Sequence, residues 1–284
     1  MQDPAQEERE RTPPGDAGEP GAPGTYLFPR DPKEVNRLDL QHYALREALY
    51  TNYLAPVSNP ARILDAGTGT GQWAFDLCRE FPDALTVGMD VGLSSKLPGP
   101  PTYRFVRGSI AEGLPFKDRT FDFVHQRLLR AGIPAAAWGT VVGDLARVTR
   151  PGGWVELAEI RNGIDPAGAA TRRLFDLLLQ LSAALKLDVD GPPRLALDGL
   201  LASAGLVEIE TRPVVVPVGE WGGRMGSFMA SNTRAMFTGL ASTFETRFSV
   251  SRAETVGLVR AMLQEVEAEH GTCTIVFAWG RQPA

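Results

Sequence analysis

The sequence of 284 residues contains little cysteine and little histidine. Its two cysteines, Cys78 and Cys273, are too few for a disulfide framework, and neither lies in a Cys/His cluster with the spacing of a zinc site. The formal net charge of −5 disfavours a phosphate backbone as partner. We therefore expect a protein with reduced thiols, no bound metal and no nucleic-acid partner.

Long apolar runs are also missing. The most apolar stretch, LFDLLLQLSAALKL, carries Asp176 and Gln180 and falls short of the roughly 18 residues that a membrane span needs. The first residues, MQDPAQEERERTPP, lack the basic and apolar regions of a signal peptide. These absences predict a cytoplasmic protein without a membrane segment. Residues 1–35 are rich in proline, glycine and acids, and we expect a disordered tail there.

From residue 36 onward the apolar residues are periodic. Residues 36–55 predict an amphipathic helix, because Leu38, His42, Leu45 and Leu49 recur at steps of three and four. Strands and helices then alternate, which predicts an α/β fold with a doubly wound, mostly parallel, Rossmann-like sheet. The expected strands are 61–66, 85–90, 102–108, 121–129, 153–160 and 272–281, with helices at 73–81, 138–149, 168–187 and 251–269, and residues 200–214 are expected to form a helix, a turn and a further strand.

The second half of the chain is less regular. Residues 36–284 are predicted to form one domain, with a cofactor-binding half at 60–160 followed by a substrate half. Within the substrate half, residues 217–250 have a mixed helical pattern and indicate a helical insertion that acts as a lid. A helix beginning after Ser251 is supported by Glu254 three residues later, the spacing of a capping box.

A glycine motif follows the first predicted strand. In RILDAGTGTGQW, Gly67, Gly69 and Gly71 permit positive φ and a close approach of backbone to ligand. A dinucleotide fingerprint needs glycine at the position of Gln72, and Asp65 would repel a pyrophosphate but suits an ammonium group. The motif therefore favours S-adenosylmethionine, whose amino-acid moiety carries an amine and a carboxylate.

The end of the second predicted strand supports this cofactor. Asp90 lies 25 residues after Asp65, where an acidic side chain accepts hydrogen bonds from the hydroxyls of an adenosine ribose. NAD enzymes place an acid there too, so the glycine motif has to discriminate between the two cofactors.

Together these blocks resemble the class I S-adenosylmethionine-dependent methyltransferases, through LDAGTGTG, VGMD, FDFVH and LARVTRPGGWVELAE. RLDLQHYAL, FDFVHQRLL, PVGEW and VFAWGRQP are further similar to the LaeA-like group of secondary metabolism. The resemblance implies a seven-stranded sheet. The cofactor contacts that it implies come from these residues: Asp65, Gly67, Thr68, Gly69, Gly71, Asp90, Val91, Ser109, Ile110 and His125. Ser109 replaces the acid that commonly receives the adenine amine, so backbone groups near Ser109 and Ile110 are expected to bind adenine.

Residues for the acceptor and for catalysis are expected where the fourth and fifth strands end. His125, Glu159 and His42 are candidate general bases, in that order, although each could instead pack or pair within the core. The candidate acceptor contacts are Tyr43, Arg127, Trp221, Met225 and Met229.

The leading hypothesis is in-line methyl transfer to oxygen, carbon or nitrogen of a small, apolar natural product. The block HQRLL follows the fourth strand in place of the DPPY-like block of base- and amide-methylating relatives, which disfavours nucleic acid as acceptor. Two alternatives stay open: a cofactor-binding regulator that acts through partners, and a cofactor-dependent cyclase. The helix at 36–55 is also a candidate surface for self-association into a homo-oligomer.

Overall fold

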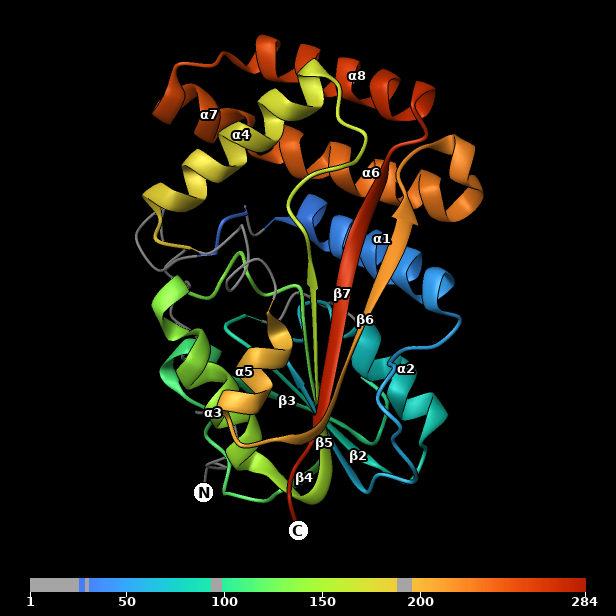
Figure 1. The fold of residues 1–284 in the computed structure, drawn as a ribbon, viewed down its shortest axis with the longest axis vertical. Coiled ribbons are helices and arrows are strands. Elements are labelled where there is room, and N and C mark those ends of the chain that lie inside the picture. Colours follow the sequence, from blue (N-terminus) through green and yellow to red (C-terminus); the bar gives the residue numbers. More distant parts are fainter. Residues whose placement is uncertain (1–25, 29–30, 93–98, 188–195) are drawn as a thin grey trace, which may run out of the picture.

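The computed structural model describes residues 26–28, 31–92, 99–187 and 196–284, which form a sheet covered by helices and topped by a helical cap (Figure 1). The strands are β1 (Arg62–Ala66), β2 (Leu85–Asp90), β3 (Tyr103–Arg107), β4 (Phe121–Arg127), β5 (Thr149–Ile160), β6 (Val207–Pro217) and β7 (Thr272–Arg281). The α-helices are α1 (Pro32–Leu49), α2 (Gln72–Glu80), α3 (Trp138–Val148), α4 (Ala169–Ala184), α5 (Leu197–Ser203), α6 (Gly223–Gly239), α7 (Ala241–Phe248) and α8 (Arg252–Ala268).

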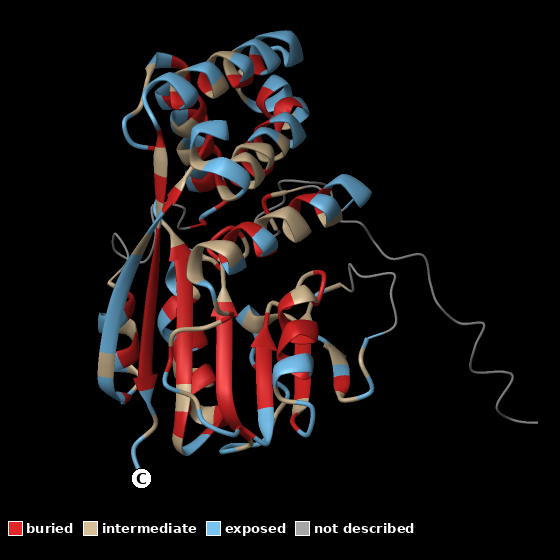
Figure 2. Cartoon of the chain, turned by 90° about the vertical axis from the view of Figure 1, so that its right-hand side faces the viewer, coloured by how far each residue is buried: buried red, intermediate tan, exposed pale blue. Residues whose placement is uncertain are grey.

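The sheet has seven strands in the order β3-β2-β1-β4-β5-β7-β6. Strands β1 to β5 are parallel, and β7 runs antiparallel between β5 and β6. The central strands are apolar along their length because helices cover both of their faces, whereas the edge strand β6 is largely exposed (Figure 2). The order reverses between β1 and β4, which is where ligands bind in sheets of this kind. The predicted doubly wound, mostly parallel sheet is confirmed.

Two layers of helices enclose the sheet. Helices α1 and α2 lie on one face, where Leu45 and Leu77 are fully buried in one apolar cluster. Helices α3 and α5 cover the other face through a second cluster that contains Leu145 and Leu201. The carboxyl ends of β1, β2 and β4 open between these layers, so the sheet itself positions the loops that follow them.

The helical cap consists of α4, α6, α7 and α8 and lies beyond the upper end of the sheet in Figure 1. The predicted insertion at 217–250 forms α6 and α7, between β6 and α8. Helix α8 begins as predicted, because the Ser251 hydroxyl accepts a hydrogen bond from the backbone N–H of Glu254. Helix α1 packs along α6 and thereby joins the cap to the sheet.

Three predicted boundaries differ from the structure. Helix α1 starts at Pro32 after an Asp31 cap and ends before Tyr50, so it lies several residues earlier than the predicted 36–55. The predicted tail at 1–35 is too long, since Leu27 is buried beneath the backbone of residue 131, while residues 1–25 lie outside the described residues. The predicted turn RPGG forms an irregularity of four residues within β5, at which the pairing of β5 with β4 changes register.

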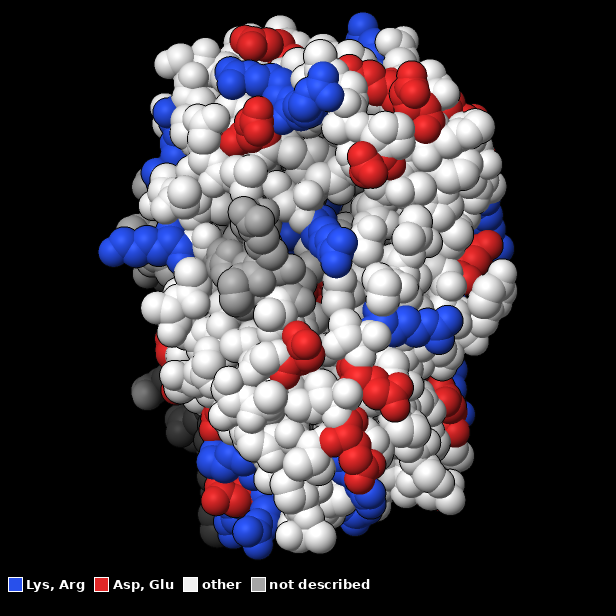
Figure 3. Space-filling view, viewed as in Figure 1, with Lys and Arg blue, Asp and Glu red and all other residues white. Residues whose placement is uncertain are grey.

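Among the described residues, no helix is long and apolar enough to cross a bilayer. On the face shown in Figure 3, Lys and Arg side chains lie among Asp and Glu side chains rather than in one continuous basic patch.

Candidate active site

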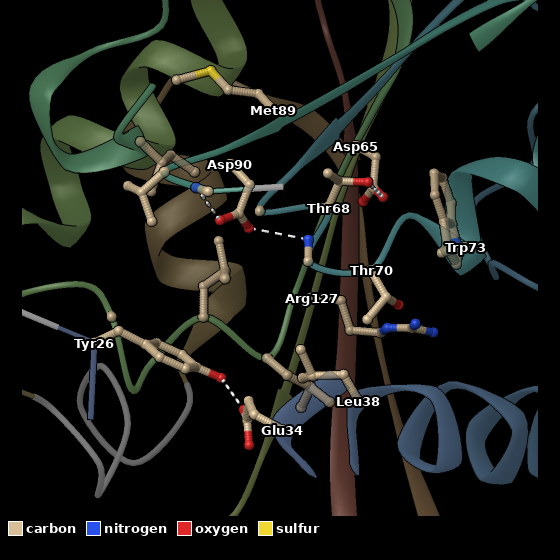
Figure 4. A pocket seen from close by; sticks show the side chains of 18 of the residues that line it. Tyr26, Glu34, Leu38, Asp65, Thr68, Thr70, Trp73, Met89, Asp90 and Arg127 are labelled. Atoms are coloured by element: carbon tan, nitrogen blue, oxygen red, sulfur yellow. Dashed lines mark hydrogen bonds between the residues drawn. The ribbon is translucent and has the colours of Figure 1, made fainter. Parts of the chain in front are cut away.

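A cavity of about 440 Å³ lies above the carboxyl ends of β1, β2 and β4 (Figure 4). The loops after these strands form its floor, and Tyr26 together with residues 31–38, at the start of α1, form its roof. The predicted cofactor residues on its wall are Asp65, Gly67, Thr68, Gly69, Asp90, Val91, Ser109 and Ile110. Sequence patterns at the ends of three strands, β1, β2 and β3, thus meet at one site.

The glycine loop has the backbone geometry that its sequence predicts. Gly67, Gly69 and Gly71 all have positive φ, at 80°, 54° and 83°. Gly67 suits this position because of its positive φ, and a Cβ there would also have to displace the side chain of Leu129, which it would meet at 2.3 Å. Gly71 is the N-terminal cap of α2 and does not itself line the cavity.

Two carboxylates are held at fixed places along the cavity floor. Asp65, at the end of β1, accepts a hydrogen bond of 2.7 Å from the Thr68 hydroxyl. Asp90, at the end of β2, accepts backbone N–H bonds from Gly69 at 3.0 Å and Gly92 at 3.2 Å. Each carboxylate is therefore oriented by the glycine loop or its neighbour before any ligand binds.

A chain of buried polar groups crosses from β4 to α2. Arg127, at the end of β4, donates from Nη2 to Nδ1 of His42 at 3.1 Å. Because Nδ1 accepts this bond, the His42 proton lies on Nε2, which is 3.1 Å from Asp76 Oδ2. Burial lowers the pKa of His42, against the opposing effect of its hydrogen bond to Asp76, so the ring is neutral.

His42 lines the cavity, but the structure does not support its predicted role as a general base. Both of its ring nitrogens are engaged, and the one that accepts is already bound to a guanidinium. His42 is 3% exposed, which further limits its access to a substrate proton.

His125 is fully buried behind the cavity wall and does not line it. Its ring stacks on Trp73 at 3.8 Å between centroids, and its Nδ1 lies 3.3 Å from Asp65 Oδ1. Burial lowers the pKa of His125 to about 4. The geometry therefore supports the packing alternative for His125, which contacts the cofactor site through the wall residues Asp65 and Trp73.

Glu159 is likewise fully buried and off the cavity wall. Its Oε1 accepts hydrogen bonds from Gln126 Nε2 at 2.6 Å and from the backbone N–H of Leu129 at 2.7 Å. Burial raises its pKa to about 7. Glu159 therefore fixes the turn after β4, and its predicted role as a base lacks access to a substrate.

The predicted acceptor residues, Arg127 apart, do not reach the cavity. Tyr43 is exposed on the outer face of α1, and Trp221 stacks on His270 at 4.9 Å between ring centroids. Met229 is 1% exposed inside the cap, where Met225 packs against the same cluster. These cap residues thus form a core, not a lid over the site, as helical spacing of apolar residues commonly indicates.

Several wall residues were missed at the sequence level. Tyr26 lies in the predicted tail, yet its hydroxyl donates to Glu34 Oε1 at 2.9 Å on the cavity roof. Glu34 in turn pairs with Arg37, whose Nη1 donates to Asn232 of α6 at 2.8 Å. The apolar wall comes from α1, α2 and the loop after β4: Leu38, Trp73, Leu128, Leu129 and Ile133. A tyrosine, a leucine and a phenylalanine in succession at 26–28 were the available signal.

Comparison with known proteins agrees with this geometry. A family model described as a methyltransferase domain matches residues 63–153. Methyltransferase str2 from Strobilurus tenacellus is 30% identical over 203 residues, which cover 68% of this chain and 71% of that protein. N-methyltransferase sirN from Leptosphaeria maculans is 28% identical over 275 residues, covering 91% of this chain and 95% of that protein. The secondary metabolism regulator laeA from Aspergillus fumigatus is 29% identical over 208 residues, which cover 70% of this chain and 54% of that protein.

Among solved structures, a protein described as a methyltransferase from an antibiotic biosynthesis pathway of Anabaena variabilis superposes with a TM-score of 0.57. The match covers 83% of this chain and 96% of that chain at 16% identity, and it shows a common fold. The chain belongs to the class I S-adenosylmethionine-dependent methyltransferases. Within that family its relatives include the LaeA-like proteins of secondary metabolism, as the sequence motifs predict.

Proposed function

We propose that this enzyme methylates a small, apolar natural product at oxygen, carbon or nitrogen. The observation that carries the proposal is one cavity that is lined by Asp65, Asp90 and the glycine loop and also by apolar side chains. The cofactor of the family is S-adenosylmethionine. The acceptor class is supported by the wall chemistry and by relatives that are named for secondary metabolism or N-methylation.

The residues on the floor fit this cofactor. Asp90 lies on the cavity wall at the end of β2, held by backbone N–H bonds from Gly69 and Gly92, and its carboxylate is assigned to the ribose hydroxyls. Asp65 offers a negative charge near the glycine loop for the ammonium group of the methionine moiety. Ser109 and Ile110 follow β3 and are assigned to adenine.

The acceptor is assigned to the apolar part of the cavity wall, to which the roof contributes Leu38 and the loop after β4 contributes Leu129 and Ile133. This wall excludes water and favours an apolar molecule by burial of its surface. Tyr26 and Glu34 are the polar groups on this side, and they are placed to orient a hydroxyl or amine of the acceptor.

The cofactor supplies an electrophilic methyl group on a sulfonium. The chain's own residues hold the two reactants in line and exclude water, which is the main requirement of a displacement reaction. Where the acceptor loses a proton, Glu34 is a carboxylate of the cavity roof, held in place by its ion pair with Arg37.

The regulator hypothesis keeps one supporting observation, the similarity over 70% of this chain to a protein named as a regulator of secondary metabolism. A regulator would bind the cofactor without transferring its methyl group to small molecules. A cyclase would also bind the cofactor without transferring its methyl group, but it would convert its substrate into a cyclised isomer.

The test combines binding and turnover. Calorimetry with S-adenosylmethionine, S-adenosylhomocysteine and NAD should show binding of the first two only. Incubation with S-adenosylmethionine carrying a deuterated methyl group, together with metabolites from the neighbouring biosynthetic genes, should transfer the label to one product. Cofactor binding without labelled product across the panel would instead support a regulator or a cyclase, and NAD binding alone would contradict the cofactor assignment.

A further inference from the structure

The order of strands arranges four site residues in a row. Along the sheet edge, β3 is followed by Ser109, β2 ends at Asp90, β1 carries Asp65 and β4 ends at Arg127. All four line the same cavity. If adenine lies near Ser109 and ribose at Asp90, the methionine moiety extends over β1 toward β4, and its end group faces Arg127.

The charges along this row match the two ends of an amino acid. Asp65 supplies a carboxylate beside the glycine loop, and Arg127 supplies a guanidinium next to it on the neighbouring strand (Figure 4). β1 and β4 pair in parallel with Asp65 opposite His125, so Arg127 lies two residues further along and on the same side of the sheet edge. A zwitterion has the same polarity, with its ammonium toward Asp65 and its carboxylate toward Arg127.

The hydrogen bonds of Arg127 leave part of its guanidinium group available to bind a carboxylate. Among the described residues, Nη2 is the guanidinium atom with a hydrogen-bond partner, His42 Nδ1, so Nε and Nη1 remain available to an anion. His42 is fixed in turn by Asp76, which Arg46 and Arg79 also contact. The side chain is thus anchored on one edge while its other edge faces the cavity.

Resting on the proposed cofactor site, we propose that Arg127 binds the carboxylate of the methionine moiety of S-adenosylmethionine, with His42 and Asp76 as residues that position its guanidinium. Arg127 is then a cofactor residue instead of the acceptor contact that the sequence predicts. A planar guanidinium meets a carboxylate through two parallel hydrogen bonds, which fixes the direction of the amino-acid end and with it the sulfonium.

The experiment compares two ligands that differ by one group. Calorimetry of the full chain is carried out with S-adenosylhomocysteine and with decarboxylated S-adenosylhomocysteine. The wild type should bind the decarboxylated ligand about 10- to 100-fold more weakly, the range expected for hydrogen bonds to a charged group. Arg127→Gln should lose a similar factor for S-adenosylhomocysteine and change little for the decarboxylated ligand.

His42→Ala tests the positioning role by the same readout. The variant should weaken S-adenosylhomocysteine several-fold and spare the decarboxylated ligand, because only the carboxylate contact depends on the orientation of Arg127. A purely structural role for His42 would weaken both ligands equally. Arg212→Ala on the exposed strand β6 is the matched loss of an arginine and should affect neither.

Two results would overturn the proposal. One is a wild type that binds both ligands equally, which needs no variant to fold. The other is an Arg127→Gln protein with unchanged affinity for S-adenosylhomocysteine, or with equal losses for both ligands. Failure of the wild type to bind either ligand would be a different result, since it would contradict the cofactor site itself.

Discussion

Replacing His125 by glutamine should change how the stability of the protein depends on pH. His125 is fully buried, and its neighbours are Asp65, Glu156, Arg127 and His42. Burial dominates and lowers its pKa to about 4 from an ordinary value of 6.5. The unfolded chain therefore binds a proton between these two pH values and the folded chain does not, so stability falls as pH falls through this window.

The magnitude follows from the two pKa values. Each unit of difference corresponds to about 1.4 kcal/mol, and the linkage relation gives a loss of about 2.5 kcal/mol between about pH 7 and about pH 4.5. The His125→Gln protein should be less stable than the wild type at pH 7, because it loses the stacking on Trp73. On acidification, however, it should lose about 2.5 kcal/mol less than the wild type does, since other groups titrate in both proteins.

Urea unfolding followed by tryptophan fluorescence, at several pH values across this window, measures the effect. The quantity to compare is the free-energy difference between wild type and variant at each pH, which removes the shared titrations. Parallel pH dependences in the two proteins would refute the buried neutral state of His125. A loss of methyl transfer of roughly 100-fold or more per folded molecule would separately restore its candidacy as a general base.

Three further predictions follow from other parts of the structure. Glu159→Gln should show a pH dependence of the opposite sign, because the raised pKa of Glu159, about 7, makes the wild-type protein lose stability as pH rises. Between about pH 4.5 and about pH 7.5 the variant should gain about 3 kcal/mol of unfolding free energy relative to the wild type. The same urea series tests this, and a free-energy difference that does not change with pH would contradict it. Asp90→Ala should weaken binding of S-adenosylhomocysteine by roughly 1 to 3 kcal/mol in calorimetry, whereas full affinity would move the ribose contact elsewhere. A chain that begins at residue 32 should have a lower Tm than one that begins at residue 26, because Leu27 is buried and Tyr26 binds Glu34. The expected loss in the free energy of unfolding is about 2 to 3 kcal/mol. Equal Tm values for the two truncated proteins would show that this segment packs without stabilising the fold.

The sequence predicted the cofactor side of the site because its signals are local. A buried strand followed by alternating glycines and an acid specifies a turn whose geometry does not depend on the rest of the chain, and Gly67, Gly69 and Asp90 lie where the pattern indicates. The strand order also follows from the resemblance, since the motifs occur in the order that the fold requires.

The acceptor side could not be predicted in the same way because it depends on tertiary contacts. His125 and Glu159 lie near the ends of their strands as expected, but both side chains are fully buried behind the cavity wall, which the strand pattern alone does not reveal. Tyr26 becomes a wall residue only because α1 folds back over the sheet. Trp221 and Met229 were assigned to a lid from their composition alone, which does not distinguish a cap core from a cavity wall.

The position of α1 has a consequence for which part of the chain can act alone. The stretch matched by the family model, 63–153, holds the glycine loop and both floor carboxylates, yet the roof and His42 come from α1, upstream of it. Arg37 of the same helix is tied to Asn232, which lies far downstream. The recognisable methyltransferase segment is therefore an incomplete binding unit: isolated from both flanks, it would leave the cofactor floor open to water and Arg127 without its anchor.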